Sequence, residues 1–173
     1  MGRLVEAYLR QTEREKAAHL YGAPLSDIDE LPVNYGVEAA SPEAAYAGSS
    51  VYLAELGSTA VGVAVVRKAE DATEIKRLWA DPGARGRGVG SALIDAVLQE
   101  HPEPVRLSVW DWRNEAMRLY MSRGFIRIPS WDERPRLVCM ERAAVQPSEA
   151  AFAPAVNGIE PANWGVRRTG TAC

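Results

Sequence analysis

The sequence predicts one α+β domain in which helices flank a mixed, mostly antiparallel β-sheet, in a sandwich-like arrangement of α and β layers. Three observations support this fold class. Residues 3–20 repeat apolar side chains at helical spacing, residues 50–80 hold three β-rich runs separated by short turns, and residues 81–142 alternate helical and extended patterns. A length of 173 residues suits one domain with a sizeable core.

The N-terminal part is expected to be helical. Over residues 3–20 the apolar side chains lie on one helix face and charges fill the other. Ser26 is a suitable N-cap for a short second helix over residues 26–31, which Pro32 ends. Residues 33–49 show no sustained period, so we expect them to be irregular.

The first half of the sheet is predicted as an antiparallel meander. Residues 50–56 and 60–68 are β-rich and are separated by Gly-Ser-Thr, a pattern typical of a hairpin. Residues 74–80 form a third run, which an Asp-Pro-Gly turn ends. Three successive strands joined by short turns indicate a meander.

Helices and strands alternate after this meander. Residues 91–100 read as a helix, residues 105–110 as a strand and residues 114–123 as a second helix. Residues 125–128 and 136–142 then form a closing hairpin.

Composition excludes several classes of protein. A net charge of −3 argues against general nucleic-acid or membrane-surface binding. Two distant cysteines and two histidines do not make a metal site, which needs three or four ligands. No apolar run reaches membrane-span length and the N-terminus lacks a signal-peptide core, so we expect a cytoplasmic protein.

Residues 84–90, Ala-Arg-Gly-Arg-Gly-Val-Gly, lie between a predicted strand and a predicted helix. Backbone N–H groups at a helix N-terminus, together with glycines and arginines, suit a pyrophosphate. The stretch lacks the Lys-Ser/Thr of a Walker A loop and does not match G-x-G-x-x-G. A plain turn with solvated arginines and a nucleic-acid contact are the alternatives, and the acidic balance disfavours the second.

Two motifs in order resemble those of the GNAT superfamily of N-acyltransferases. The pattern Arg85-x-x-Gly88-x-Gly90, after Leu-Trp-Ala-Asp-Pro, resembles that family's acyl-CoA pyrophosphate loop. Residues 107–125 resemble its second motif: a strand, an Asn, Ala-x-x-Leu-Tyr and a closing Gly-Phe. The matching residues are Asn114, Ala116, Leu119, Tyr120, Gly124 and Phe125.

The resemblance covers residues 50–142 and implies a GNAT fold, in which two splayed strands form a cleft for acyl-CoA. It implies an N-acetyltransferase domain over residues 1–142, followed by an Ala/Pro/Gly-rich tail or docked arm over residues 143–173. Acetyl-CoA would be the acyl donor and the amine of a small molecule or peptide the acceptor, with no metal. The residues implied in acetyl-CoA binding are Leu78, Trp79, Ala80, Arg85, Gly86, Arg87, Gly88, Val89, Gly90, Ser91, Asn114 and Tyr120.

Two residues carry the implied catalysis. Tyr120 matches the family's general acid, and a phenol of pKa about 10 is neutral at pH 7 and can protonate a thiolate. Glu74 matches the glutamate base of some members, acting directly or through a water. Period-2 alternation places Glu74 on the strand face that carries Leu78 and Ala80, with Trp79 opposite and therefore in the core. A core aromatic and a solvated strand charge are the structural alternatives for Tyr120 and Glu74.

The remaining expectations concern the acceptor side and the sheet edge. Trp112 and Trp131 lie in predicted loops and could line an acceptor pocket. GNAT chains usually begin with a strand, which this sequence lacks before its first helix, so residues 50–56 would form a bare sheet edge. We expect part of residues 150–167 to cover this edge, either within this subunit or from a neighbour in a homodimer. The apolar side chains available for this contact are Phe152, Val156, Ile159 and Trp164. A disordered tail is the alternative.

An N-acetyltransferase is therefore the leading interpretation of the sequence. A non-catalytic CoA-binding or interaction module that keeps the GNAT fold is the runner-up. The carboxyl group of Glu74 and the phenol of Tyr120, both expected at the cleft, favour catalysis. Acetylation of a panel of amines would distinguish the enzyme from the non-catalytic module.

Overall fold

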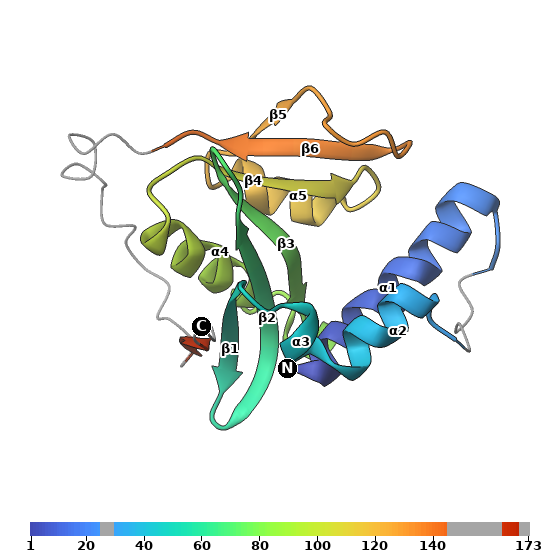
Figure 1. Cartoon of the computed structure of the whole chain (residues 1–173), viewed down its shortest axis with the longest axis horizontal. Coiled ribbons are helices and arrows are strands. Elements are labelled where there is room, and N and C mark those ends of the chain that lie inside the picture. Colours follow the sequence, from blue (N-terminus) through green and yellow to red (C-terminus); the bar gives the residue numbers. More distant parts are fainter. Residues whose placement is uncertain (25–29, 145–163, 170–173) are drawn as a thin grey trace.

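A seven-stranded sheet forms the centre of the molecule, with strand order β5-β6-β4-β3-β2-β1-β7 (Figure 1). The computed structural model describes residues 1–24, 30–144 and 164–169. The strands are β1 (Ser50–Leu56), β2 (Thr59–Lys68), β3 (Thr73–Ala80), β4 (Val105–Trp110), β5 (Ile126–Ile128), β6 (Leu137–Arg142) and β7 (Trp164–Thr169). The helices are α1 (Gly2–Tyr21), α2 (Val33–Ala40), α3 (Pro42–Ala45), α4 (Val89–Glu100) and α5 (Asn114–Met121), with a 3-10 turn, η1, at Pro82–Ala84.

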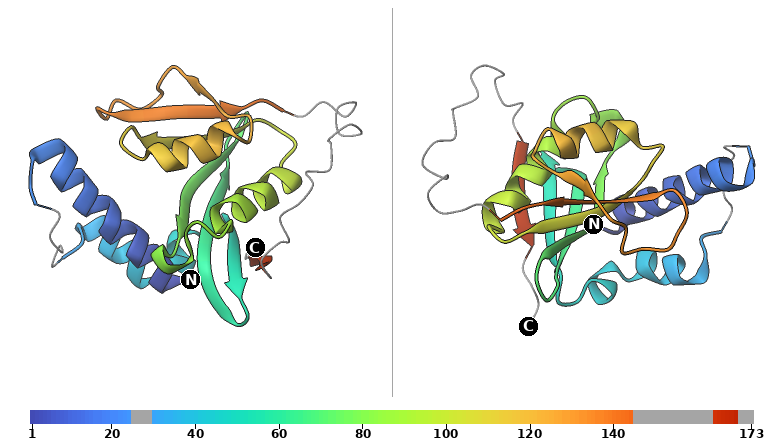
Figure 2. Two further views of the ribbon diagram at one scale, coloured as in Figure 1. Left: turned by 180° about the vertical axis from the view of Figure 1, so that it is seen from behind. Right: turned by 90° about the horizontal axis from the view of Figure 1, so that it is seen from above.

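Helices cover both faces of this sheet, as Figures 1 and 2 show. On one face, α4 and α5 bury side chains such as Leu93, Val97 and Met117 against β1–β4. On the other face, Leu4 of α1 packs with Val63 and Trp79. The mixed sheet with flanking helices confirms the predicted fold class, and the strands and long helices fall close to their expected ranges.

Helices α2 and α3 correct the expectation that residues 33–49 are irregular. The eight-residue α2 buries none of its side chains, and Val33 and Val37, which lie one helical turn apart, are 86% and 62% exposed. It is held instead by polar contacts: Glu38 accepts two hydrogen bonds from Arg77 of β3, at 2.9 and 3.0 Å, and one from the Tyr46 hydroxyl. The helix expected over residues 26–31 falls mainly on residues 25–29, outside the described part of the chain, and Glu30 and Leu31 are not helical.

The meander β1–β2–β3 is antiparallel, as expected, but β3 contains a bulge. Val65 pairs with Arg77 while Val66 pairs with Ile75, so Lys76 is an extra residue in β3. The bulge reverses the alternation along the strand. Ile75 consequently lies in the same core cluster as Leu78 and Ala80.

Strands β3 and β4 run parallel but pair over only three residues each, Thr73–Ile75 with Val105–Leu107. Beyond Ile75 no described strand pairs with β3 on the β4 side, and the two strands separate. This is the splayed pair that the resemblance implies, and it opens the cleft described below.

Strand β7 pairs antiparallel with β1 along its whole length, from Val51 with Thr169 to Leu56 with Trp164. The edge expected to be bare is therefore covered by a segment of the tail. Arg167 and Arg168 reinforce the pairing, because Arg167 binds Glu55 at 2.8 Å and Arg168 binds Ser50 at 2.9 Å. Phe152, Val156 and Ile159 lie outside the described residues. None of the helices in the described ranges is long and apolar enough to cross a membrane.

Candidate active site

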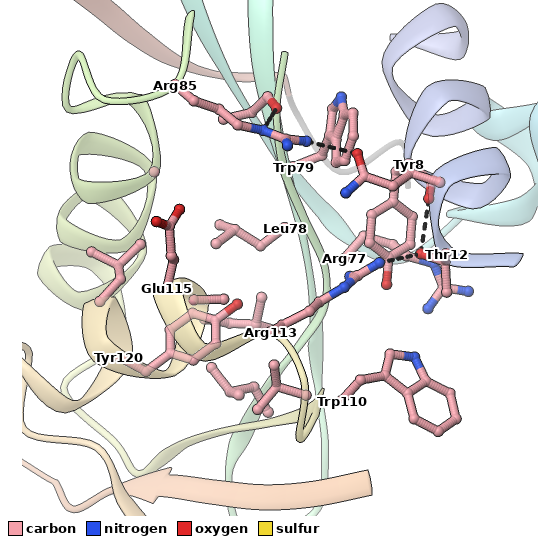
Figure 3. Close-up of a pocket in the computed structure, with 18 of the residues that line it drawn as sticks. Tyr8, Thr12, Arg77, Leu78, Trp79, Arg85, Trp110, Arg113, Glu115 and Tyr120 are labelled. Carbon is pink, nitrogen blue, oxygen red and sulfur yellow. Dashed lines mark hydrogen bonds between the residues drawn. The ribbon is translucent and has the colours of Figure 1, made fainter. Parts of the chain in front are cut away.

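A cleft of about 1790 Å³ opens where β3 and β4 separate (Figure 3). Residues 85–92 and α5 form one side of the cleft, and α1 forms the other. Leu78 and Ala80 of β3 and Val109 of β4 lie between these sides. One opening thus brings together the glycine-rich stretch, the second motif and the N-terminal helix.

The glycine-rich stretch is a loop that leads directly into α4. Gly88 is the N-cap of α4, with a φ of 87° that side-chain-bearing residues rarely adopt. Gly90 lies in the first turn, where a Cβ would meet Cδ2 of Leu119 at 3.1 Å, so glycine allows α4 and α5 to approach closely. Val89 is buried and anchors the turn, while Ser91 and Arg87 line the cleft.

Arg85 crosses from this loop to the two walls of the cleft. Its Nε donates to the Ala80 carbonyl at 3.1 Å and its Nη2 donates to Gln11 of α1 at 2.9 Å. The guanidinium also lies 4.5 Å from the ring centre of Trp79. Trp79 is buried on the α1 face of the sheet, as its alternation predicted, and it reaches the cleft through this stack.

Tyr120 of α5 lies in the cleft and is only 6% exposed. Its ring packs against Phe125, with ring centres 5.9 Å apart, and its phenol oxygen faces the open space in Figure 3. Burial raises the pKa of the Tyr120 phenol above its ordinary value; Tyr8 adds to this effect, and the positive charge of Arg113 opposes it. The phenol is therefore protonated at neutral pH and can donate a proton.

Glu74 lies outside the cleft, and the alternation that placed it beside Leu78 and Ala80 is wrong. The bulge at Lys76 gives Ile75 that position instead. The Glu74 carboxylate accepts a hydrogen bond from Lys76 Nζ at 2.9 Å, and Glu74 is not among the described residues that line the cleft. Lys76 itself lines the cleft, so Glu74 lies directly behind a lining residue, and its role as the base stays a prediction.

Asn114 lines the cleft, but it is not the N-cap of α5 that its residue type suggests. It is the first residue of the helix, Arg113 is the N-cap, and the Asn114 amide nitrogen lies 3.4 Å from the Trp112 carbonyl. Its exposed side chain is thus available to a ligand. Of the two loop tryptophans, Trp112 lines the cleft, whereas Trp131 is 42% exposed and packs under Arg106 outside it.

The α1 wall contributes residues that the sequence did not single out. Arg113 reaches across the cleft to α1, where its Nε donates to Glu15 at 2.7 Å. Its Nη2 donates to Thr12 at 2.8 Å (Figure 3). The Tyr8 ring lies between two guanidiniums, with its centre 5.5 Å from Arg113 and 5.7 Å from Arg77. Tyr8 follows the apolar period of α1, so its spacing alone marks it as a core residue.

Glu15 is the ionised anchor of this wall. Its carboxylate accepts hydrogen bonds from Gln11 Nε2, from Trp112 Nε1 at 3.1 Å and from Arg113. Burial alone would raise the pKa of Glu15, but the charge of Arg113 and the three donated hydrogen bonds hold it below its ordinary value. A carboxylate of low pKa that already accepts three hydrogen bonds is a poor proton acceptor.

Residues 6–125 match the family model described as "Acetyltransferase (GNAT) family", and this match spans more than half of the chain. The chain therefore belongs to the GNAT acetyltransferase family, an acyltransferase family whose members act on amines. No curated protein matches the chain in sequence.

Solved structures of this family share the fold. The PaiA N-acetyltransferase of Thermoplasma acidophilum, in complex with coenzyme A, is 17% identical with a TM-score of 0.62, over 82% of this chain and 92% of that one. A GNAT acetyltransferase of Staphylococcus aureus is 18% identical, with a TM-score of 0.55 over 81% and 93% of the two chains. A GNAT acetyltransferase of Elizabethkingia anophelis with acetyl-CoA bound is 15% identical, with a TM-score of 0.51 over 67% and 94%.

Proposed function

We propose that this protein is an N-acetyltransferase that moves an acetyl group from acetyl-CoA directly to a primary amine of a small molecule or peptide. The observation that supports this most strongly is the meeting of the glycine loop and the Tyr120 phenol in one cleft, between strands that separate. The CoA and acetyl-CoA in two structural relatives agree with the choice of donor.

The loop after β3 supplies the chemistry that a pyrophosphate needs. The first turn of α4 leaves N–H groups unpaired, and the glycines keep side chains away from them. Arg85 and Arg87 add positive charge to the same rim of the cleft. By resemblance to the family, the edge of β3 at Leu78 and Ala80, beyond its pairing with β4, would take the pantetheine arm as an added strand.

The transfer itself needs one nucleophile and one acid. The amine nitrogen attacks the thioester carbonyl carbon, and the C–S bond breaks as the acetyl–nitrogen bond forms. In the family's arrangement the Ala80 N–H polarises the carbonyl, an oxyanion-hole role. Tyr120 donates its phenol proton to the departing thiolate, and the proton that the amine loses restores the phenol, directly or through solvent.

The decisive experiment joins binding and turnover. Acetyl-CoA is titrated into the protein by calorimetry, and release of free thiol is then followed against a panel of primary amines. Saturable binding together with amine-dependent thiol release and an N-acetylated product by mass spectrometry is the expected result. Binding without transfer to any amine would instead identify a CoA-binding module.

A further inference from the structure

The acceptor side of the cleft has a charge pattern that bears on which amine binds there. This side consists of Tyr8, Thr12 and Glu15 of α1 with Arg77 of β3 and Arg113. Figure 3 shows Tyr8 and Thr12 across the cleft from Glu115 and Tyr120 of α5. The remaining carboxylates of the lining lie elsewhere: Asp95 of α4 binds Arg123 at 3.1 Å, and Glu115 is on α5.

Glu15 is the only carboxylate among the described lining residues on this side, and it is already occupied. Three donors hold its two oxygens, one of them the guanidinium of Arg113. A cationic amine entering the cleft would therefore find Glu15 already paired with Arg113, and Glu38 already paired with Arg77. A polyamine, which needs carboxylates for its additional ammonium groups, fits such a surface poorly.

Hydrogen-bond donors, in contrast, remain available. A guanidinium has five N–H donors, and Arg113 uses one on Glu15 and one on Thr12. Arg77 uses two on Glu38 and one on the Lys76 carbonyl. The Tyr8 ring contacts both guanidiniums, and its hydroxyl adds a further donor to this group, whose arginines are held by Glu15 and Glu38.

We propose that the acceptor amine also carries a carboxylate, as an α-amino acid or a short peptide does, and that Arg113, Arg77 and Tyr8 bind that carboxylate. This inference rests on the proposed N-acetyltransferase function and names its substrate class. A planar carboxylate matches the two-pronged donor geometry of a guanidinium.

The two arginines are assigned to recognition and not to removal of the amine proton. Arg113 is paired with Glu15 and Arg77 with Glu38, so neither guanidinium is an uncompensated positive charge that would favour the neutral amine. The amine attacks only in its neutral form, and its proton leaves to solvent or to the phenolate of Tyr120.

The test compares matched acceptors on the full-length protein at saturating acetyl-CoA. A panel of α-amino acids and dipeptides is measured against the corresponding amides, with spermidine as a cationic amine. The acids should have a kcat/KM about 10- to 100-fold higher than their amides, the effect of one or two charge-assisted hydrogen bonds. The difference should reside mainly in KM.

Variants assign this preference to named residues. Arg113→Gln should abolish the preference for acids over amides, Arg113→Lys should restore part of it, and Tyr8→Phe should weaken it by removing one hydroxyl. Arg136→Gln is the matched control, because Arg136 also pairs with a carboxylate, that of Asp111, and also donates to α1, at the His19 carbonyl, but does not line the cleft. Melting curves accompany each variant, and Tyr8→Phe keeps the test decisive if Arg113→Gln unfolds.

Two failures can be told apart. Equal or faster acetylation of the amides or spermidine, or a preference that Arg113→Gln and Tyr8→Phe leave unchanged, overturns this inference while the acetyltransferase function stands. Binding of acetyl-CoA with no transfer to any amine overturns the proposed function, and this inference with it.

Discussion

Arg168 of β7 and Glu100 at the end of α4 are joined by a hydrogen bond of 2.9 Å between Nη1 and Oε2. The same carboxylate oxygen accepts a hydrogen bond from the buried Tyr52 hydroxyl of β1, also at 2.9 Å. The last described strand is thus fastened to both the helix layer and the strand that it covers.

Removal of this strand should destabilise the domain. A chain that ends at Ala144 loses the β1–β7 ladder, which we estimate at about 3 kcal/mol net for a ladder of this length, and its Tm should fall by about 6–12 °C. A chain that ends at Thr169 keeps β7 and is the control. Calorimetry and size-exclusion chromatography provide the measurement; equal melting of the two chains would mean that β7 adds no stability.

The charge at the glycine loop should control acetyl-CoA affinity. Gly88 has a positive φ, which Asn tolerates better than other side chains, so Gly88→Asn tests the added bulk and Gly88→Asp adds a negative charge of the same shape. We expect Gly88→Asp to raise the Kd for acetyl-CoA at least about tenfold over Gly88→Asn, the cost of placing a carboxylate near phosphates. Titration calorimetry measures both, and equal affinities would remove the loop from the phosphate site.

Tyr120→Phe should lower kcat by about 10²- to 10⁴-fold, the range for loss of a general acid. It should leave acetyl-CoA affinity within about twofold, because only a hydroxyl is lost. Since burial holds the pKa of Tyr120 above its ordinary value, the acid form persists as pH rises to about 10. Below pH 10, the kcat of the wild-type protein should therefore not fall with rising pH unless the kcat of Tyr120→Phe falls in the same way.

Glu74→Gln should change kcat/KM by less than about threefold, because Glu74 does not line the cleft and its carboxylate is already paired with Lys76, which does. The acidic limb of the pH–rate profile should persist, since it reports the protonation of the amine itself. Loss of that limb in Glu74→Gln, with an unchanged limb in Lys76→Gln, would restore Glu74 as the base acting through water.

A polar cluster beside α4 should make stability depend on pH. The Thr73 hydroxyl donates to Glu103, and mainly for this reason the pKa of Glu103 falls from 4.5 to about 2. The folded state gains this stability above pH 4.5 and loses it as the pH falls toward 2. Thr73→Val should therefore cost about 1 kcal/mol at neutral pH, with a smaller difference near pH 2, whereas Thr73→Ser should resemble the wild type. Urea unfolding across this range measures the difference, and a gap that is constant with pH would exclude the link.

The strands and the cofactor loop were predictable because their signals are local. Period-2 runs marked β1, β2 and β4 within a residue of their ends, and the glycines marked the start of α4. The position of Glu74 was not predictable, because a bulge depends on how two strands pair and shifts every later side chain to the other face. The α1 wall was missed for a similar reason: Arg113 reaches residues a hundred positions away, and nothing local to Thr12 or Glu15 records that contact.

The order of strands along the chain affects how the domain is synthesised. Residues 57–163 separate β1 from β7, so β1 leaves the ribosome long before its neighbour is made. At 5–20 residues per second, this delay is roughly 5–20 seconds. During that interval the hydrogen-bonding edge of β1 faces solvent or other nascent chains, and β1 gains β7 as its neighbour only after residues 57–163 have been made.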